Sequence, residues 1–215
     1  MVTSELRVMI LEDDQDHARL LELQLQRIPD VAFRVTCCET SDEAIESLRS
    51  QRFDVLLLDY WLESGTCEPV LSSLRRDPAV PAVIVTTSAN DEYVAATVSR
   101  AGAHRYVRKL DLSASFLQEA IRGAIADSER SREAGQAADF ARRRLAKLTP
   151  REREVAYLIG QGFLSKQIAV ELGCAEGTVN LHRSHIMAKT RARGVADLIR
   201  MVLLAEDAVS DAELN

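Results

Sequence analysis

The sequence predicts two domains of different class: a doubly wound parallel α/β domain, followed by a small domain made only of helices. Five short apolar stretches alternate with five amphipathic stretches over about the first 125 residues, which is the pattern of a parallel sheet covered by helices. The stretches ending at Asp59 and at Thr87 are continuously apolar, as in strands buried on both faces. Four helical patterns without a strand pattern follow residue 148 and predict the second domain.

Start and stop signals place the elements of the first domain. Pro29 ends the first helix, Thr40 and Glu43 form a capping box at the start of the second, and Asn90 caps the helix that Gly102 ends. The expected strands are 6–11, 31–38, 53–59, 82–87 and 105–108. The expected helices are 16–28, 41–48, 70–75, 90–100 and 116–125, with a loop at 63–65.

The second domain begins with three start signals in four residues: Thr149 as a cap, Pro150 at the first helical position and Glu152 at the third. Gly173 closes the second of its helices, so that two short helices joined by a tight turn predict a helix-turn-helix. The expected helices are 150–159, 165–172, 176–189 and 195–205. Between the domains, 127–147 is expected to be a partly helical linker interrupted near Gly135, and 206–215 an acidic tail.

Composition indicates a globular protein of the cytoplasm. Hydrophobic residues make up 47% and charged residues 28% of the 215 residues, and no apolar run reaches the length of a membrane span. The sequence does not begin with the basic stretch and apolar stretch that are typical of a secretory signal. Four cysteines lack the spacing of zinc ligands, and we expect reduced thiols rather than disulfides. These are Cys37, Cys38, Cys67 and Cys174.

Charge is unevenly distributed along the chain. The net charge is −6 overall, but residues 1–126 carry −7 and residues 147–200 carry +4. A basic segment after an acidic one predicts that only the second domain meets a polyanion.

Polar residues follow the expected strands where the strands end: Glu12 and Asp13, Asp59, Thr87, and Lys109. The carboxyl ends of parallel strands meet at one edge, so we expect these side chains to converge. Three carboxylates there would repel one another unless a cation neutralised them, and oxygen ligands favour Mg²⁺. A carboxylate beside Mg²⁺, with an ammonium and a hydroxyl, suits phosphoryl transfer onto aspartate.

With these residues, 5–126 resembles the receiver domain of two-component response regulators, which implies a flavodoxin-like sheet of order 2-1-3-4-5. The resemblance implies that Asp59 is phosphorylated by a sensor histidine kinase. It implies a Mg²⁺ site and a phosphoryl-binding and switch group. The site would comprise Glu12, Asp13, Asp59 and the backbone carbonyl of Trp61, and the switch group Thr87, Ser88, Tyr106 and Lys109.

Three further positions of the receiver segment are considered separately: Leu110, His17 and His104. Many receivers have a cis-proline after the lysine, whereas this chain has Leu110. We expect His17 and His104 to be surface or capping residues rather than catalytic groups.

Four motifs mark the second domain: 148–155 (LTPREREV), 166–169 (KQIA), 177–189 (GTVNLHRSHIMAK) and 198–201 (LIRM). With these motifs, residues 148–205 resemble the LuxR-type helix-turn-helix domains, and the third and fourth motifs lean toward the FixJ-like branch of the NarL/FixJ family. On the third helix Val179 and Ile186 recur at seven residues and should face the core. The family's usual capping serine is replaced by Ala175, which removes a cap.

The opposite side of that helix is expected to meet DNA. Expected base contacts are Asn180, Leu181 and Ser184. Expected phosphate contacts are Lys166, Thr178, Arg183 and Lys189.

The sequence therefore predicts a DNA-binding transcriptional regulator, not an enzyme, that is switched by phosphorylation of Asp59 and forms a homodimer when phosphorylated. Expected partners are a sensor histidine kinase and double-stranded DNA, with RNA polymerase a further candidate. Two alternatives stay open. One is a regulator controlled by partner binding, and the other a phosphatase with an aspartyl-phosphate intermediate, although such phosphatases need a second aspartate where this chain has Trp61.

Overall fold

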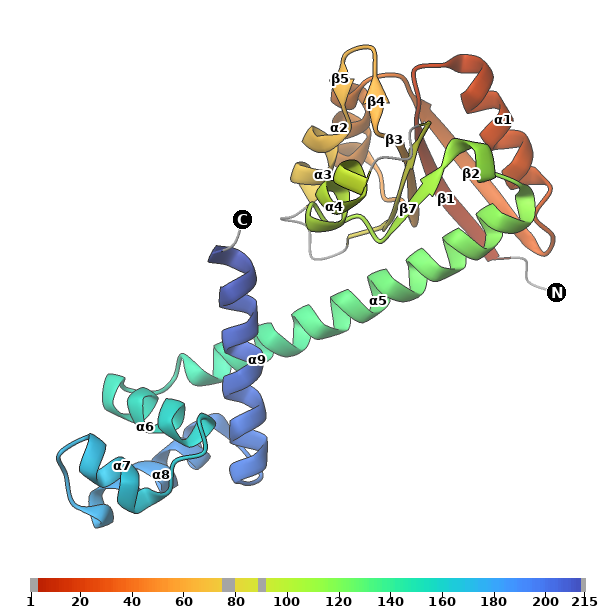
Figure 1. Cartoon of the computed structure of the whole chain (residues 1–215). Helices are drawn as coiled ribbons and strands as arrows, with labels where there is room; N and C mark the ends of the chain where they lie inside the picture. The colour runs from red at the N-terminus through yellow and green to blue at the C-terminus, as the bar shows by residue number, and fades with distance from the viewer. Residues whose placement is uncertain (1–3, 75–79, 89–91, 214–215) are drawn as a thin grey trace. The chain divides into compact units, whose positions relative to one another are not determined.

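A computed structural model describes residues 4–74, 80–88 and 92–213 of the chain (Figure 1). By its contacts the chain divides into two compact units, Met1–Arg132 and Glu133–Asn215. Each unit has a hydrophobic core of its own. The expected capping residue Asn90 lies outside the described residues.

The first unit is built on a five-stranded parallel sheet. Its strands pair in the order β2-β1-β3-β6-β7, which is 2-1-3-4-5 when these five are numbered along the chain. The fold class predicted for this part is confirmed. Every residue of β3 and β6 is buried, as their continuous apolar runs require. The strands are β1 (Ser4–Leu11), β2 (Val31–Cys38), β3 (Val55–Asp59), β6 (Ala82–Thr87) and β7 (Arg105–Arg108).

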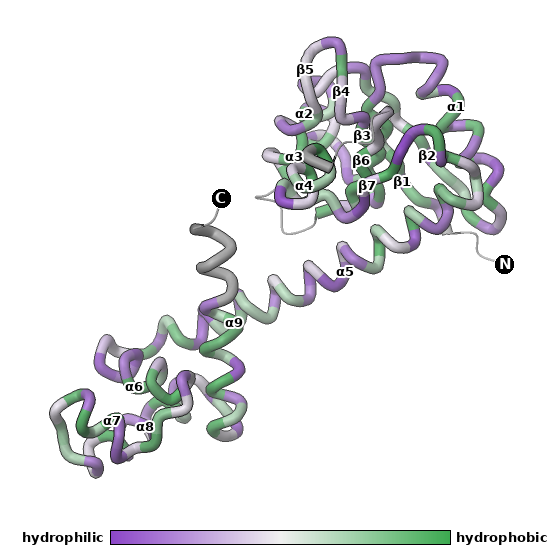
Figure 2. Tube along the Cα trace, viewed as in Figure 1, coloured by the Kyte–Doolittle hydropathy of each residue, from purple (hydrophilic) through white to green (hydrophobic). Residues whose placement is uncertain are grey.

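Helices cover both faces of this sheet (Figure 1). Leu21 and Leu25 from α1 and Leu117 from α5 pack on one face, whereas Val70 from α3 and Val98 from α4 pack on the other. Hydrophobic residues accordingly concentrate along the central strands in Figure 2. The helices are α1 (Gln15–Gln26), α2 (Ser41–Ser50), α3 (Glu68–Leu74), α4 (Glu92–Arg100) and α5 (Ala114–Leu145).

Two local features differ from the sequence expectations. The loop expected at 63–65 belongs to a small antiparallel hairpin of β4 (Trp61–Leu62) and β5 (Gly65–Thr66). The capping box at α2 is half formed: Thr40 accepts a hydrogen bond from the Glu43 N–H, but the Glu43 carboxylate accepts from the N–H of Glu39.

Helix α5 is continuous from Ala114 to Leu145, so the interruption expected near Gly135 does not occur. All nine residues 129–137 are exposed, and a side chain at Gly135 would meet no atom within 4 Å. A single glycine costs a helix only about 1 kcal/mol relative to alanine, which is too little to break it.

The second unit consists of the last part of α5 and four further helices. The expected capping box at Thr149 and Glu152 is present, and Val179 and Ile186 are fully buried, as predicted. Helix α9 continues through residues expected as a tail. The helices are α6 (Pro150–Gly160), α7 (Ser165–Glu171), α8 (Glu176–Thr190) and α9 (Val195–Glu213).

Helices α6 and α9 approach each other closely. A Cβ atom at Gly160 would lie 2.6 Å from Cγ1 of Val202, so this contact requires glycine. Throughout the described ranges, the helices are too short or too polar to span a membrane.

Candidate functional site

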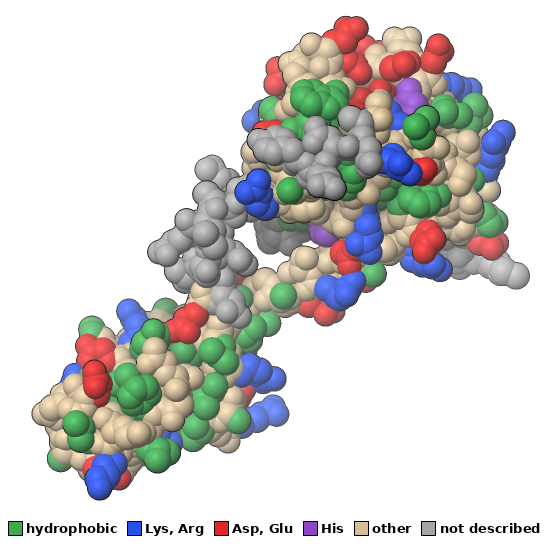
Figure 3. All heavy atoms as spheres, in the orientation of Figure 1, with side chains coloured by type: hydrophobic (Ala, Val, Ile, Leu, Met, Phe, Trp, Pro, Cys, Tyr) green, Lys and Arg blue, Asp and Glu red, His purple; other side chains and the backbone are tan. Residues whose placement is uncertain are grey.

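The carboxylates of Glu12, Asp13 and Asp59 form a cluster at the carboxyl ends of β1 and β3. One oxygen from each lies within 4.8 Å of the others. The pairing of Leu11 with Leu58 brings the two strand ends side by side. Glu12 and Asp59 are buried, while Asp13 is half-buried. Figure 3 shows acidic side chains gathered at this end of the first unit, where the β4–β5 hairpin lies.

Lys109 joins two of these carboxylates. Its Nζ lies 2.7 Å from Oδ2 of Asp59 and 2.7 and 2.9 Å from the two oxygens of Glu12. The lysine follows the end of β7, 50 residues after Asp59 in the chain. The pairing of strands in the sheet therefore brings the two side chains together. The lysine and these two carboxylates, predicted to converge, do so.

The pKa values of these groups reflect burial and pairing. Burial raises the pKa of Asp59 to about 6, and the charge of Glu12 adds to it, while the hydrogen bond from Lys109 opposes it. Burial also acts to raise the pKa of Glu12, but hydrogen bonds from His17 and Lys109 outweigh it and lower that pKa. The pKa of Lys109 is raised because its bonds to Asp59 and Glu12 outweigh its burial. Burial therefore dominates at Asp59, whereas hydrogen bonds dominate at Glu12.

The remaining expected switch residues surround this end of the sheet. Thr87 is fully buried at the end of β6 and Ser88 is exposed. Tyr106 on β7 is half-buried against the core on the α4 side. The hydroxyl of the neighbouring Thr86 donates to the Leu58 carbonyl at 3.4 Å, inside the sheet.

The segment after Asp59 is held in place by several contacts. The Trp61 N–H donates to the Asp59 carboxylate, and the Trp61 ring, about half exposed, stands edge-on to Tyr60. The Glu63 N–H donates to Oδ2 of Asp13. The hairpin therefore connects to the acidic cluster, which the sequence did not reveal.

The structure corrects the interpretation of His17. Its Nδ1 lies 2.6 Å from Oε2 of Glu12, so it is part of the cluster rather than a surface or capping residue. His104 instead has a backbone role, since its Nδ1 accepts a hydrogen bond from the Val83 N–H. After Lys109 the chain forms a short 3-10 helix, Lys109–Asp111, and no peptide bond of the described residues is cis, the one before Leu110 included.

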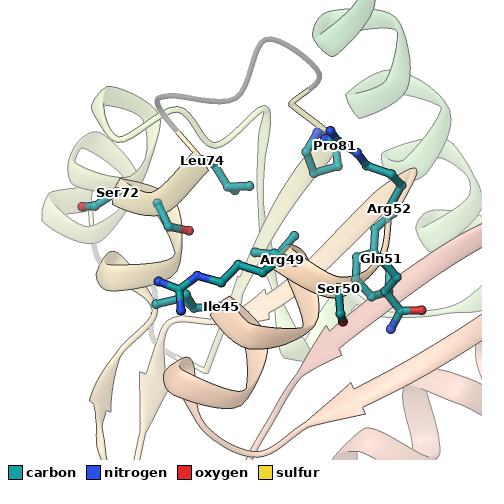
Figure 4. A pocket seen from close by; sticks show the side chains of 11 residues that line it. Ile45, Arg49, Ser50, Gln51, Arg52, Ser72, Leu74 and Pro81 are labelled. Atoms are coloured by element: carbon teal, nitrogen blue, oxygen red, sulfur yellow. The ribbon is translucent and has the colours of Figure 1, made fainter.

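A cavity of about 630 Å³ lies at the opposite end of the sheet. It is bordered by α2, by the end of α3 and by the residues that precede β3 and β6; Figure 4 shows Arg49, Ser72 and Pro81 around it. The described residues of its lining include no carboxylate. We therefore place the chemistry at the acidic cluster and not at this cavity.

In the second unit, helix α8 presents the residues expected to meet DNA bases. Asn180, Leu181 and Ser184 are exposed, and the Ser184 hydroxyl donates to the Asn180 carbonyl at 3.1 Å. Among the expected phosphate contacts, Lys166 and Thr178 are exposed and Arg183 is half-buried. The N-cap of α8 is Ala175, and it has no side-chain hydrogen bond, as predicted.

Lys189 is in a different position from the other expected phosphate contacts. Its Nζ binds both carboxylate oxygens of Glu152, at 2.6 and 2.8 Å. Glu152 is 3% exposed and lies in the first turn of α6, so this ion pair connects α8 to α6. The sequence placed both residues but gave no sign that they would meet.

Both units match families of known proteins. Residues 8–122 match the response regulator receiver domain, and residues 146–202 match the bacterial regulatory proteins of the luxR family. Nodulation protein W of Bradyrhizobium diazoefficiens is 30% identical over 90% of this chain and 84% of that protein. Transcriptional regulatory protein FixJ of Azorhizobium caulinodans is 32% identical over 66% of this chain and 67% of that protein. The structure of response regulator StyR is similar with a TM-score of 0.57 and 26% identity, covering 93% of this chain and 98% of that one.

Proposed function

Because the chain belongs to the response regulators that join a receiver domain to a LuxR-type DNA-binding domain, we propose that phosphorylation of Asp59 controls its binding to DNA. The observation that carries the proposal is the buried pair of Asp59 and Lys109 beside two further carboxylates. We place the receiver at 5–126, the linker at 127–147, the DNA-binding domain at 148–205 and an acidic tail at 206–215. The cytoplasm is the proposed compartment.

The acidic cluster fits a divalent cation. Its donors are carboxylate oxygens close enough to share one ion, which is the donor set that Mg²⁺ prefers. Asp13, Asp59 and the carbonyl of Trp61 would hold the ion directly, and Glu12 through water. When bound, Mg²⁺ would neutralise oxygens of the transferred phosphoryl group.

The phosphoryl donor is proposed to be a phosphorylated histidine of a sensor kinase. A carboxylate oxygen of Asp59 forms a bond to phosphorus while the bond from phosphorus to the histidine nitrogen breaks, and that nitrogen keeps the electron pair and takes a proton. Lys109, now bound to Asp59 and Glu12, can turn its ammonium to a phosphoryl oxygen. Thr87 and Ser88 are the proposed hydrogen-bond donors to the other oxygens.

Thr87 and Lys109 would move toward the phosphoryl group. This movement would change the positions of β7, of Tyr106 on that strand and of the flanking helices, and so favour a receiver homodimer. Reversing a 1:99 equilibrium needs about 5.5 kcal/mol. A single phosphoryl group adds one to three charge-assisted hydrogen bonds, so the concentration-dependent free energy of dimerisation is the proposed amplifier.

The proposed DNA contacts are side chains of the second unit that solvent can reach. Asn180, Leu181 and Ser184 would meet base edges in the major groove. Lys166, Thr178 and Arg183 would bind phosphates, whereas the ion pair with Glu152 leaves Lys189 a structural role. RNA polymerase is the proposed further partner of the bound dimer. We propose no enzymatic activity, because Trp61 occupies the position of the acid that aspartyl-phosphate phosphatases need.

The test compares the wild-type full chain with the variant Asp59→Asn. The control variant is Asp42→Asn, which changes an exposed acid of α2. Acetyl phosphate is the phosphodonor, and Mg²⁺ is present throughout. We expect mass spectrometry to find a phosphoryl group on Asp59 in the wild type and in the control only. Gel shifts on DNA from around this gene should tighten after phosphorylation, and sedimentation should show a dimer. Equal DNA affinity with and without phosphorylation would instead support control by a partner.

A further inference from the structure

His17 is fixed in place by the start of helix α1. The N-cap residue Asp14 accepts hydrogen bonds from the N–H groups of Asp16 and His17, at 2.9 and 3.1 Å. The imidazole is then directed back to Glu12, with Nδ1 2.6 Å from Oε2. The His17 side chain is 16% exposed and that of Glu12 is 1% exposed. The contact is therefore largely shielded from water.

Glu12 has donors on both carboxylate oxygens. Lys109 reaches Oε1 at 2.9 Å and Oε2 at 2.7 Å, and His17 reaches Oε2. An ionised carboxylate only accepts hydrogen bonds, so Nδ1 of His17 carries the proton. Lys109 also serves Asp59, and it would leave Glu12 in part when it turns to a phosphoryl group. His17 has no such second task, since among the described residues its imidazole hydrogen-bonds only to Glu12.

We propose that His17 is a positioning residue of the magnesium site: its Nδ1–H fixes Oε2 of Glu12 and thereby keeps this carboxylate in place beside Asp13 and Asp59. His17 acts through Glu12 and does not itself bind the ion. This role rests on the proposed function of the acidic cluster. Groups that orient metal ligands commonly affect metal affinity by 10–100-fold, and because Glu12 would hold the ion through water we expect the lower end of this range, about tenfold.

A purely structural role makes a different prediction. If the contact only anchored α1, its loss would lower the stability of the metal-free receiver and leave the affinity for Mg²⁺ unchanged. The test must therefore measure metal binding and stability separately. Trp61 is the only tryptophan of the chain and lies two residues after Asp59, so its fluorescence reports on this site.

The experiment titrates the unphosphorylated full chain with Mg²⁺ at pH 8, followed by Trp61 fluorescence and by calorimetry. His17→Ala is compared with His17→Asn, whose amide N–H can replace Nδ1–H, and with His185→Ala, an exposed histidine of the other unit. We expect about a tenfold loss of Mg²⁺ affinity in His17→Ala, a loss of less than threefold in His17→Asn, and none in His185→Ala. If His17→Ala does not fold, His17→Leu, which fills the space of the ring without a donor, replaces it.

Two outcomes overturn the positioning role: an unchanged or higher Mg²⁺ affinity in His17→Ala, or a loss in His17→Asn as large as in His17→Ala. Thermal unfolding in EDTA supplies the stability comparison, and a lowered melting temperature with unchanged affinity identifies the anchoring role instead. Asp13→Ala separates this proposal from the proposed function. If the wild type does not bind Mg²⁺, or Asp13→Ala binds it equally well, the magnesium site itself is wrong and the role of His17 falls with it.

Discussion

The ammonium of Lys189, near the end of α8, bridges both carboxylate oxygens of Glu152 at the start of α6. The two residues are 37 positions apart in the chain. The same Glu152 carboxylate accepts a hydrogen bond from the Thr149 N–H, so one side chain both caps α6 and holds α8. The orientation of the proposed recognition helix thus depends on a charged pair at the end away from its base-contacting residues.

Lys189→Ala should destabilise the DNA-binding domain, because it leaves the nearly buried Glu152 without its cation. We expect a loss of about 1–3 kcal/mol, measured by urea denaturation of the full chain. Arg183→Ala is the matched comparison: it should leave stability unchanged, weaken binding to all DNA sequences and reduce the salt slope by about one. Normal stability of Lys189→Ala together with a reduced salt slope would show that Lys189 contacts phosphate instead.

The same pair predicts a dependence of stability on acid. The hydrogen bonds from Lys189 and from the Thr149 backbone lower the pKa of Glu152 from 4.5 to about 2. The pKa is lower in the folded state, so the carboxylate stabilises the fold fully above pH 4.5, and this contribution is lost as the pH falls toward 2. Glu152→Gln should therefore be less stable than the wild type at pH 6, with the difference shrinking between pH 4.5 and 2. A constant difference over that range would argue against the ion pair.

Asp59 predicts the opposite change of stability with pH. Burial raises its pKa from 3.8 to about 6, so the ionised side chain destabilises the fold above pH 6, and protonation relieves this as the pH falls toward 3.8. Asp59→Asn should be more stable than the wild type by about 1–3 kcal/mol at pH 8 in EDTA. The gain should decrease below pH 6. Urea denaturation at pH 8 and pH 4.5 checks this, and an equal gain at both values would contradict it.

Restoring the missing cap of α8 should stabilise the second unit. Ala175 has the extended backbone of an N-cap but no side-chain acceptor. Ala175→Ser should supply one and add about 0.5–2 kcal/mol, read as a higher urea midpoint. Ala175→Val, which cannot cap, serves as the control. If serine and valine have the same effect, the helix start does not limit stability.

The sheet and its site could be predicted because strands buried on both faces leave continuous apolar runs, and a parallel sheet brings strand ends together. Individual contacts between side chains left no such signal. His17 meets Glu12 only because Asp14 sets the start of α1, and Lys189 meets Glu152 only through the packing of α8 on α6. Hairpin β4–β5 has strands of two residues, too short for an alternating pattern. At Gly135 the favourable propensity of the surrounding helix outweighed one unfavourable residue.

The close approach of α6 to α9 constrains how the second unit can evolve. Any side chain at position 160 would overlap Val202, so a larger residue there becomes acceptable only after position 202 has become smaller. Substitutions at these two positions should therefore be inherited as pairs, in which a larger residue at position 160 accompanies a smaller residue at position 202. Lineages that change position 160 first would pass through a poorly folded ancestor, which gives the two mutations a preferred historical order.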